Sequence, residues 1–245
     1  MKIDITNQMK LKLKYLFCLL VIALSYHPSM ALNHIKTPKR LKIGYSIGVA
    51  SITPQKMQDT KSAGVDYLEV SLSSFLDKTR KFKSTDEEMR EKVIAAKKAA
   101  DDAGVKIWSI HMPFSKDIDL SLTDESERRN VVALHTKILN YCKILKPEVI
   151  LFHPSYFLGL NEREQRKKQL IKSAVELNKQ VKAIKAIMVI ENMLGYELNV
   201  GADRERPLCR TVEEVSEIMS RLPANIYAAV DMNHIKYPER LIRAL

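Results

Sequence analysis

Six side chains that can bind a metal ion or move a proton stand at or near the ends of short apolar runs in this sequence. They are Glu69, His111, His153, Glu191, Asp231 and His234. Neutral imidazole nitrogens and carboxylate oxygens together suit divalent cations such as zinc, manganese, iron or cobalt. The same groups serve as general acids and bases. This residue set therefore predicts metal binding, proton transfer or both, if the fold brings the side chains together.

The elements that must position these residues alternate between strand and helix. The apolar runs of strand length are residues 41–47, 65–72, 105–110, 149–152, 187–190 and 226–230, and stretches with helical spacing lie between them. This alternation predicts an α/β fold with a parallel sheet and right-handed crossovers. A doubly wound sheet and a (β/α) barrel both satisfy the pattern. In a barrel, the carboxyl ends of the strands face one shared mouth.

Two details refine the expected fold. The strands are apolar throughout rather than alternating, so we expect both faces of the sheet to be buried. The segments 63–65 and 103–105 both read Ala-Gly-Val, which is typical of a helix that ends at a glycine and is followed at once by a strand. His135 lies on the apolar face of a predicted helix, and we interpret it as a packing residue.

Each candidate site residue also has a structural interpretation when it is taken alone. His111 and His153 can be hydrogen-bonded core histidines. Glu69 can form an ion pair at a strand end, and Asp231 can cap the following helix. Glu191 is harder to explain in this way because it follows the apolar run Ile-Met-Val-Ile, and a buried charge must be paired or coordinated. The ordered set is therefore stronger evidence for a shared site than any single member.

The N-terminal segment has the features of a secretory signal peptide. Three closely spaced lysines precede an apolar run at residues 16–25, and the small residues Ser29 and Ala31 stand just before Leu32. The apolar run is shorter than the roughly 20 residues that span a bilayer, although an uncleaved membrane anchor is the alternative. We therefore expect residues 1–31 to be removed, and the protein to be exported to the periplasm or secreted without a stable membrane span.

Composition narrows the class of protein. The chain has 245 residues, of which 46% are hydrophobic and 28% charged, as in ordinary soluble globular proteins. Three cysteines exclude a disulfide scaffold, and we expect no bridge between Cys142 and Cys209. The formal net charge is +11, but the lysines are spread over the predicted helices. We therefore expect a solvated surface and no nucleic-acid partner.

From residue 41 to the end, the sequence resembles the xylose isomerase-like TIM-barrel superfamily. The shared motifs are AGVDYLEVSL at residues 63–72, His-x-Pro at 111–113, Phe-His-Pro at 152–154, Ile-Glu-Asn at 190–192 and Asp-x-x-His at 231–234. That superfamily includes sugar isomerases and epimerases and the endonuclease IV branch. The resemblance implies a (β/α)8 TIM-barrel domain at residues 32–245 and a divalent metal, either Mn²⁺, Zn²⁺, Co²⁺ or Mg²⁺.

The resemblance also implies roles for three residues on the last two predicted strands. Glu191 resembles the strand-five metal ligand, which in the epimerases also moves protons. Asp231 resembles the strand-six metal ligand. His234 resembles the histidine that contacts substrate one turn later, and we predict that it takes part in catalysis with Glu191.

Four further residues are predicted to bind substrate. His111 and His153 resemble the strand-three and strand-four histidines, which bind zinc in the endonuclease branch and face the sugar or the mouth in many epimerases. Glu69 matches a glutamate that is common on strand two of the isomerases. Trp108 and Phe114 flank the His111 segment and line either the mouth or the core; we assign Trp108 to the substrate site.

The sequence departs from the family pattern in two places. The endonuclease branch carries a histidine after strand one, whereas this chain reads Ile-Gly-Tyr-Ser at residues 43–46. Only six βα units are recognised where a barrel has eight, so the barrel is expected to be truncated, with no counterpart of strands seven and eight. We therefore expect little or no turnover by this chain alone, and self-association through exposed strand edges.

These observations favour an exported sugar isomerase or epimerase that acts on a small sugar or sugar derivative. A metal-bound carboxylate would remove the proton beside a carbonyl and give an enediolate. The alternatives are an endonuclease IV-like zinc phosphodiesterase and a degenerate sugar-binding barrel without activity. A barrel lyase or hydrolase of oxidised sugars, with the same ligands, is the fourth interpretation.

Overall fold

The structure is a computed structural model that describes residues 40–77, 79–156, 162–194, 207–235 and 237–245. The chain divides into two units, residues 1–41 and 42–245, and all helices and strands described here belong to the second. The predicted signal peptide lies outside the described residues. Within those described ranges, no helix combines the length and the apolar character that a membrane crossing requires.

Six parallel strands form one sheet. They are β1 (Gly44–Gly48), β2 (Tyr67–Ser71), β3 (Lys106–His111), β4 (Val149–Phe152), β5 (Ile187–Glu191) and β6 (Ile226–Ala229). Their order in the sheet is their order in the chain. A doubly wound sheet reverses its strand order at a switch point, whereas a (β/α)8 barrel does not. The topology is therefore that of six consecutive βα units of a TIM barrel, as the sequence predicts.

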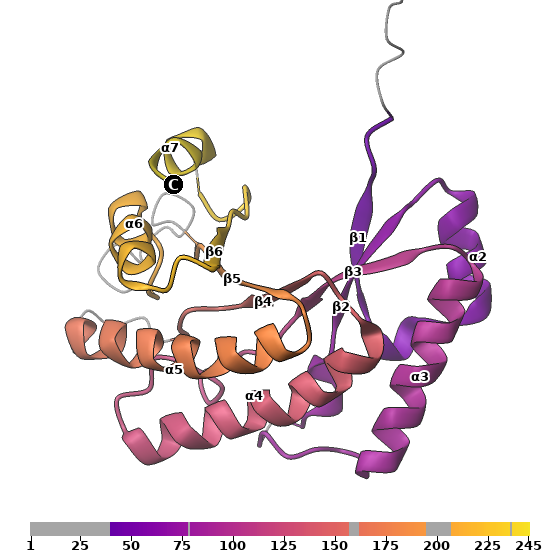
Figure 1. Cartoon of the computed structure of the whole chain (residues 1–245), viewed down its shortest axis with the longest axis horizontal. Helices are drawn as coiled ribbons and strands as arrows, with labels where there is room; N and C mark the ends of the chain where they lie inside the picture. Colours follow the sequence, from indigo (N-terminus) through magenta and orange to yellow (C-terminus); the bar gives the residue numbers. More distant parts are fainter. Residues whose placement is uncertain (1–39, 78, 157–161, 195–206, 236) are drawn as a thin grey trace, which may run out of the picture. The chain divides into compact units, whose positions relative to one another are not determined.

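The helices that follow the strands lie along one face of this sheet, with α3, α4 and α5 side by side (Figure 1). Their bounds are α2 (Pro54–Ser62), α3 (Asp86–Asp102), α4 (Glu125–Leu145), α5 (Arg163–Ala183), α6 (Val212–Arg221) and α7 (Pro238–Ala244), with short 3₁₀ turns η1 (Val49–Ser51) and η2 (Ser73–Phe75). The core lies between these helices and the sheet.

Local sequence signals explain where the helices start and end. Thr85 and Glu88 form a reciprocal capping box at the start of α3, which satisfies two main-chain N–H groups. Gly64 and Gly104 follow the ends of α2 and α3 with φ angles of 80° and 67°. Glycine adopts this left-handed conformation without a steric cost, so the predicted glycine caps at both junctions are confirmed.

The prediction that both faces of the sheet are buried is wrong. Side chains such as Leu68 and Val70 point toward the helices and are fully buried. On the other face Trp108, Ile187 and Tyr227 are 44%, 47% and 53% exposed. In a closed barrel, strands from across the ring cover this inner face, but among the described residues β1 and β6 are edge strands that do not pair with each other.

His135 and the two described cysteines belong to the core. His135 is buried on α4 and meets the Phe152 ring edge-on, with the ring centroids 5.3 Å apart. Burial lowers the pKa of this imidazole to about 3, so it is neutral at physiological pH. The packing role predicted for His135 is confirmed. Cys142 and Cys209 are both buried, and neither forms a disulfide.

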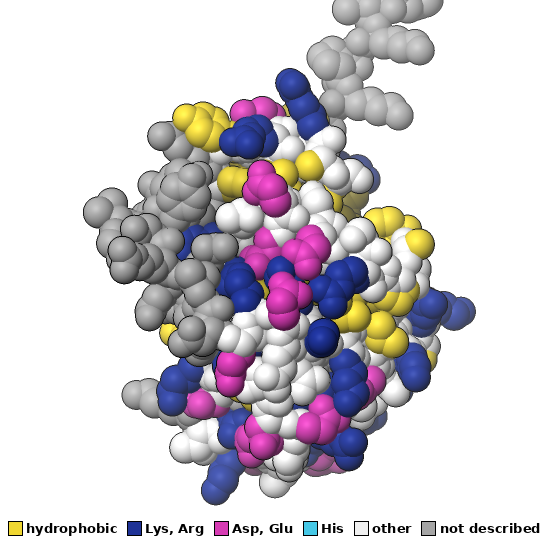
Figure 2. Space-filling view, turned by 90° about the vertical axis from the view of Figure 1, so that its left-hand side faces the viewer, with side chains coloured by type: hydrophobic (Ala, Val, Ile, Leu, Met, Phe, Trp, Pro, Cys, Tyr) yellow, Lys and Arg dark blue, Asp and Glu magenta, His cyan; other side chains and the backbone are white. Residues whose placement is uncertain are grey.

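The surface over α5 and α6 mixes both signs of charge. Figure 2 shows one face of the molecule, on which Lys and Arg side chains are interspersed with Asp and Glu. Lys167 of α5 lies 2.7 Å from Glu217 of α6, and Arg163 at the start of α5 forms an ion pair with Glu214 of α6. These ion pairs link α6 to α5.

Candidate functional site

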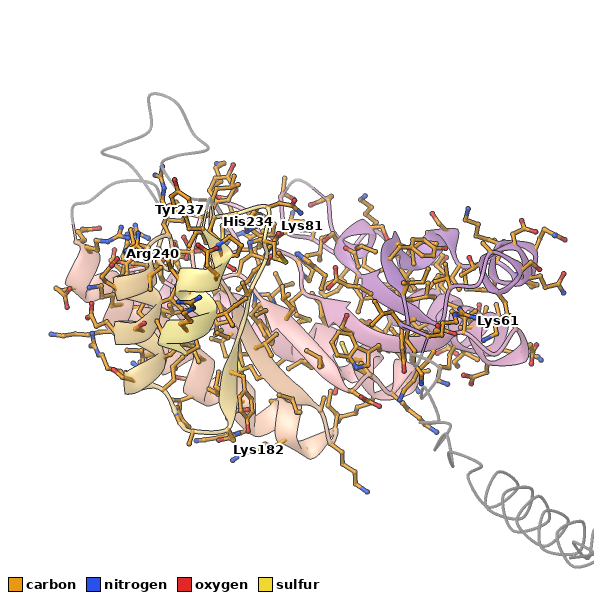
Figure 3. The ribbon with its side chains drawn as sticks, turned by 90° about the horizontal axis from the view of Figure 1, so that it is seen from above. Lys61, Lys81, Lys182, His234, Tyr237 and Arg240 are labelled. Carbon is orange, nitrogen blue, oxygen red and sulfur yellow. The ribbon has the colours of Figure 1, made fainter. Side chains whose placement is uncertain are left out.

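The candidate site is a cavity of about 640 Å³ at the carboxyl ends of the strands. The six residues singled out in the sequence all line it: Glu69, His111, His153, Glu191, Asp231 and His234. In Figure 3, Lys81 from the loop after β2 and His234 from the segment after β6 lie on the same side of the molecule, and Lys182 at the end of α5 lies on the opposite side. Parallel strands in chain order thus bring together residues that are far apart in the sequence.

Two imidazoles from neighbouring strands meet in this cavity. The Nε2 atoms of His111, at the end of β3, and His153, just after β4, lie 3.1 Å apart. His111 Nδ1 lies 3.1 Å from the carbonyl oxygen of Met112. A carbonyl can only accept a hydrogen bond, so the proton of His111 is on Nδ1 and the Nε2 lone pair faces the cavity. The Phe114 ring stacks on the His153 imidazole at 3.5 Å between centroids and an angle of 13°.

Glu191 lies at the centre of the cluster. It is the last residue of β5, pairs in register with Ala229 of β6 and is only 6% exposed. Its Oε2 atom is 2.9 Å from His153 Nε2, and its Oε1 atom is 3.7 Å from His234 Nδ1. Among the described residues, neither Glu191 Oε2 nor His153 Nδ1 has a partner with hydrogen-bond geometry. One oxygen of this buried carboxylate is therefore left without the donor that such a group requires.

The segment after β6 supplies the other two groups. His234 Nδ1 donates a hydrogen bond of 2.7 Å to the main-chain carbonyl of Asn192, so its Nε2 atom carries the lone pair. That Nε2 atom is 3.4 Å from Asp231 Oδ2. The other carboxylate oxygen of Asp231 accepts a hydrogen bond from the main chain of Asn233 at 2.7 Å. Asp231 therefore closes a tight turn and does not cap the following helix α7, whose N-cap residue is Tyr237. Its Oδ2 atom faces His234.

The electrostatics of the site favour neutral imidazole. Burial lowers the pKa of His153, and the neighbouring carboxylate of Glu191 only partly opposes this effect. The neutral ring is the form that binds metals. Burial thus favours a neutral ring over a cation for the imidazole next to Glu191.

The donor atoms form two groups that can each hold a divalent cation. One group is His111, His153 and Glu191, and the other is Glu191, Asp231 and His234; in each, one donor atom per residue lies within 4.8 Å of the others. Nitrogen and oxygen ligands at tetrahedral zinc lie roughly 3.3 Å from one another, close to the 2.9 and 3.1 Å found around His153. A cation would supply the missing partner of Glu191 Oε2 and would bind the Nε2 lone pairs of His111 and His234. The residues present therefore fit a divalent cation.

Trp108, which was also predicted to bind substrate, does not line this cavity, so the structure does not bring it together with the other six predicted site residues. It stands three residues before His111 on β3, which is about 10 Å along a strand, and its indole N–H donates to Glu148 at 3.1 Å. Trp108 borders a separate hollow on the inner face, next to Tyr67. Glu69 lines both spaces and accepts a 3.4 Å hydrogen bond from Ser109.

Sequence reasoning gave no role to two residues that shape the site. Ser46 on β1 lines the cavity. Asn192 follows Glu191 directly and binds the main chain of Asp231 through its side chain. Asn192 stands within the quoted Ile-Glu-Asn motif, but an asparagine after a strand has many uses. The contact with Asp231 depends on the pairing of β5 with β6, which spacing along the chain does not show.

Comparison with known proteins identifies a family that covers the strands and helices around the site. The family model described as xylose isomerase-like TIM barrel matches residues 57–241. No curated protein matches the sequence.

Several solved structures of sugar epimerases share the fold. D-psicose 3-epimerase from Clostridium cellulolyticum H10 is 17% identical, with a TM-score of 0.58 over 77% of this chain and 63% of that one. A D-tagatose 3-epimerase-like protein is 16% identical, with a TM-score of 0.63 over 83% and 71%. 3-keto-D-glucoside 4-epimerase from E. coli is 13% identical, with a TM-score of 0.58 over 83% and 74%. This chain thus spans less than two thirds of the psicose epimerase, and at these identities the similarity shows the fold alone.

Proposed function

Because this chain belongs to the xylose isomerase-like TIM barrel family, we propose that it is an isomerase or epimerase of a small sugar or sugar derivative that uses a divalent cation. The observation that carries the proposal is the convergence of Glu191, Asp231 and His234 from two adjacent strand ends. The fold shared with sugar epimerases supports the substrate class.

Glu191, Asp231 and His234 are the residues that would hold the cation. A bound divalent ion acts as a Lewis acid on a carbonyl oxygen and as a template for neighbouring hydroxyl groups. Mn²⁺, Co²⁺, Zn²⁺ and Mg²⁺ are all compatible with oxygen and nitrogen donors, and the mixed set favours the first three. His111 and His153 then face the remaining space and are available to the hydroxyl groups of a sugar.

Glu191 is the base in the proposed reaction. Its Oε2 atom has no hydrogen-bond donor among the described residues, so it is free to accept a proton. It takes the proton from the carbon beside the substrate carbonyl, and the electron pair of that C–H bond moves into an enediolate. Return of a proton to the same or the opposite face gives an isomer or an epimer. General acid–base assistance of this kind contributes about 10²–10⁴-fold.

His234 is the second acid–base group in this scheme. The hydrogen bond from Nδ1 to Asn192 leaves Nε2 available for a proton. Epimerisation by opposite faces works best with a second base held at the same cation. Among the described residues, the two donor groups contain no carboxylates besides Glu191 and Asp231. We therefore propose that this chain alone turns over slowly.

Hydrogen exchange tests the proposal directly. The purified chain with saturating Mn²⁺ is incubated in D₂O with a panel of ketoses and aldoses, and ¹H NMR follows deuterium entry beside the carbonyl. We expect slow exchange into one class of sugar, and Glu191→Gln is expected to abolish it. Sugar binding without exchange would favour the non-catalytic barrel and overturn the enzymatic proposal.

A second candidate function is supported by the other donor group. His111, His153 and Glu191 form a histidine-rich set that suits zinc. A zinc phosphodiesterase of the endonuclease IV kind would use both groups at once and would bind DNA with a steep salt dependence. Binding of more than one zinc per chain, together with cleavage of abasic DNA, would favour this function over the first.

A further inference from the structure

We propose that Asn192 is a positioning residue that sets the separation of Glu191 from Asp231 and the tautomer of His234. This inference deepens the proposed function, and its metal-dependent part rests on that function. It is carried by the hydrogen bonds of one residue that immediately follows the candidate base.

Every polar group of Asn192 is engaged with the segment that ends β6 and follows it. Its main-chain N–H donates to the carbonyl of Ala229 at 3.2 Å, and its main-chain carbonyl accepts from His234 Nδ1 at 2.7 Å. Its side-chain oxygen accepts from the main-chain N–H of Asp231 at 2.7 Å, and its side-chain Nδ2 donates to the Asp231 carbonyl at 3.2 Å. The residue is 2% exposed, so these bonds are shielded from water.

The side-chain amide of Asn192 makes the hydrogen bonds to Asp231 that a neighbouring strand would make if the sheet continued. The pairing of β5 with β6 ends at Glu191 and Ala229, two residues before Asp231. Among the described residues, the last main-chain hydrogen bond between the two segments runs from the Asn192 N–H to the Ala229 carbonyl. The Asn192 side chain presents one acceptor and one donor to the main chain of Asp231, as a neighbouring strand would. The side chain of Asn192 thus holds the main chain of Asp231 next to Glu191, and the donor atoms of the two carboxylates lie within 4.8 Å of each other.

The main-chain carbonyl of Asn192 fixes the protonation of His234. A carbonyl oxygen only accepts, so Nδ1 of His234 must carry the proton and Nε2 the lone pair. Nε2 is the atom that faces Asp231 at 3.4 Å. Partners of this kind orient metal-binding groups, and their loss typically costs about 10- to 100-fold in metal affinity.

Asparagine suits this position better than any other residue. Alanine has neither the donor nor the acceptor. Aspartate keeps the volume and the acceptor for the Asp231 N–H, but it places a carboxylate oxygen against the Asp231 carbonyl. Asn192→Ala therefore removes both side-chain hydrogen bonds to Asp231, whereas Asn192→Asp removes only the one that Asn192 donates. Asn178 supplies the control, because it is also a buried asparagine but lies on α5 outside the cavity.

The first measurement is a titration of the full chain with Co²⁺, followed by its visible absorption. We expect the wild type to show d–d bands and Asn192→Ala to bind Co²⁺ at least tenfold more weakly with altered bands. Asn178→Ala should stay within twofold of the wild type. An Asn192→Ala protein with the affinity and spectrum of the wild type would overturn the proposal.

The second measurement needs no metal. In ¹⁵N-histidine-labelled protein, NMR at pH 8 reports which nitrogen of His234 carries the proton. We expect the Nδ1–H tautomer in the wild type and in Asn178→Ala. Both Asn192 variants keep the main-chain carbonyl, but they lose the side-chain bonds that hold the Asp231 segment beside it. His234, three residues later, is then free to move away from this carbonyl, and we expect a mixture of tautomers in Asn192→Ala and Asn192→Asp. Unchanged tautomers in both Asn192 variants would refute the positioning role. Should the wild type bind no Co²⁺, the metal-dependent function fails, whereas a tautomer change still supports the role of Asn192.

Discussion

Glu191 and His153 are buried against each other, with 2.9 Å between Oε2 of the carboxylate and Nε2 of the imidazole. Burial lowers the pKa of His153, so its ring does not supply a full positive charge to the neighbouring carboxylate. A buried carboxylate without a cation is costly to the folded state. Folding therefore brings Glu191 against an imidazole whose positive charge is disfavoured by burial.

Glu191→Gln is expected to stabilise the metal-free protein while it abolishes metal binding. The substitution keeps the side-chain volume and removes the buried charge. The free energy of unfolding should therefore rise by about 1–3 kcal/mol, which is several degrees in Tm. Calorimetry in EDTA measures the stability, and Co²⁺ titration measures the binding.

Glu214 provides the matched control for this substitution. It is equally buried, but it pairs with Arg163 across α5 and α6. Glu214→Gln should therefore lower the Tm, because breaking a buried ion pair costs about 3–5 kcal/mol. If both glutamine variants lower the Tm equally, Glu191 is an ordinary structural residue.

Divalent metal is expected to stabilise the wild-type protein against heat. A ligand that binds only the folded state at 100 times its Kd adds about 2.7 kcal/mol of stability. Differential scanning fluorimetry with Mn²⁺, and then with excess EDTA, follows the gain and its reversal. Asp231→Asn should show little gain, since it removes one of the carboxylates that would hold the ion. Equal gains in both proteins would place the ion elsewhere.

Phe114→Ala is expected to weaken Co²⁺ binding to the donor group of His111, His153 and Glu191 by about 2- to 10-fold. The Phe114 ring stacks on His153, and such a contact is worth about 0.5–1.5 kcal/mol. Without it, the imidazole gains rotational freedom that must be lost again on binding. Trp108→Ala is the comparison variant, because Trp108 lies outside the cavity and should leave Co²⁺ affinity unchanged. A larger effect at Trp108 than at Phe114 would reverse this assignment.

His135 is expected to make the protein less stable in mild acid. Its pKa is about 3 in the folded state and roughly 6.5 when unfolded. The contribution of the neutral His135 to the free energy of unfolding is fully present above pH 6.5. It is lost as the pH falls toward 3, because the unfolded chain then binds a proton that the folded chain does not. Between pH 7.5 and pH 5, urea denaturation should show about 2 kcal/mol more loss for the wild type than for His135→Leu. Parallel pH profiles would contradict this.

We propose that the protein is exported, and expression of the full gene tests this. Cleavage after Ala31 predicts a mature N-terminus at Leu32, which mass spectrometry of the periplasmic fraction detects. Ala31→Arg should block processing, because the peptidase site requires a small residue. An intact Met1 in a protein that stays in the cytoplasm would refute export.

The order of strands and the gathering of the site residues followed from the sequence for a simple reason. A parallel sheet in chain order places every strand end at one edge, so knowing that His111, His153 and Glu191 end strands is nearly enough to place them together. The glycine caps at Gly64 and Gly104 were predictable because the left-handed backbone there admits few other residues.

Other features depended on contacts that run between strands. Trp108 was assigned to the mouth because it is near His111 in the chain. The two residues lie three positions apart on the same strand, β3, which places them about 10 Å apart along it. The burial of both sheet faces was inferred from apolar composition, yet burial of the inner face depends on strands from across the ring. The hydrogen bonds from the Asn192 side chain to the main chain of Asp231 have no sequence pattern of their own, because they join residues 39 positions apart.

The two outer strands also govern how the protein behaves in concentrated solution. Among the described residues, β1 and β6 each carry one row of main-chain N–H and C=O groups that no neighbouring strand covers. Such a row binds any extended polypeptide with little regard for its side chains. We expect the colloidal stability of the preparation to depend steeply on concentration, so that dilution keeps the molecules apart and crowding drives strand-to-strand association.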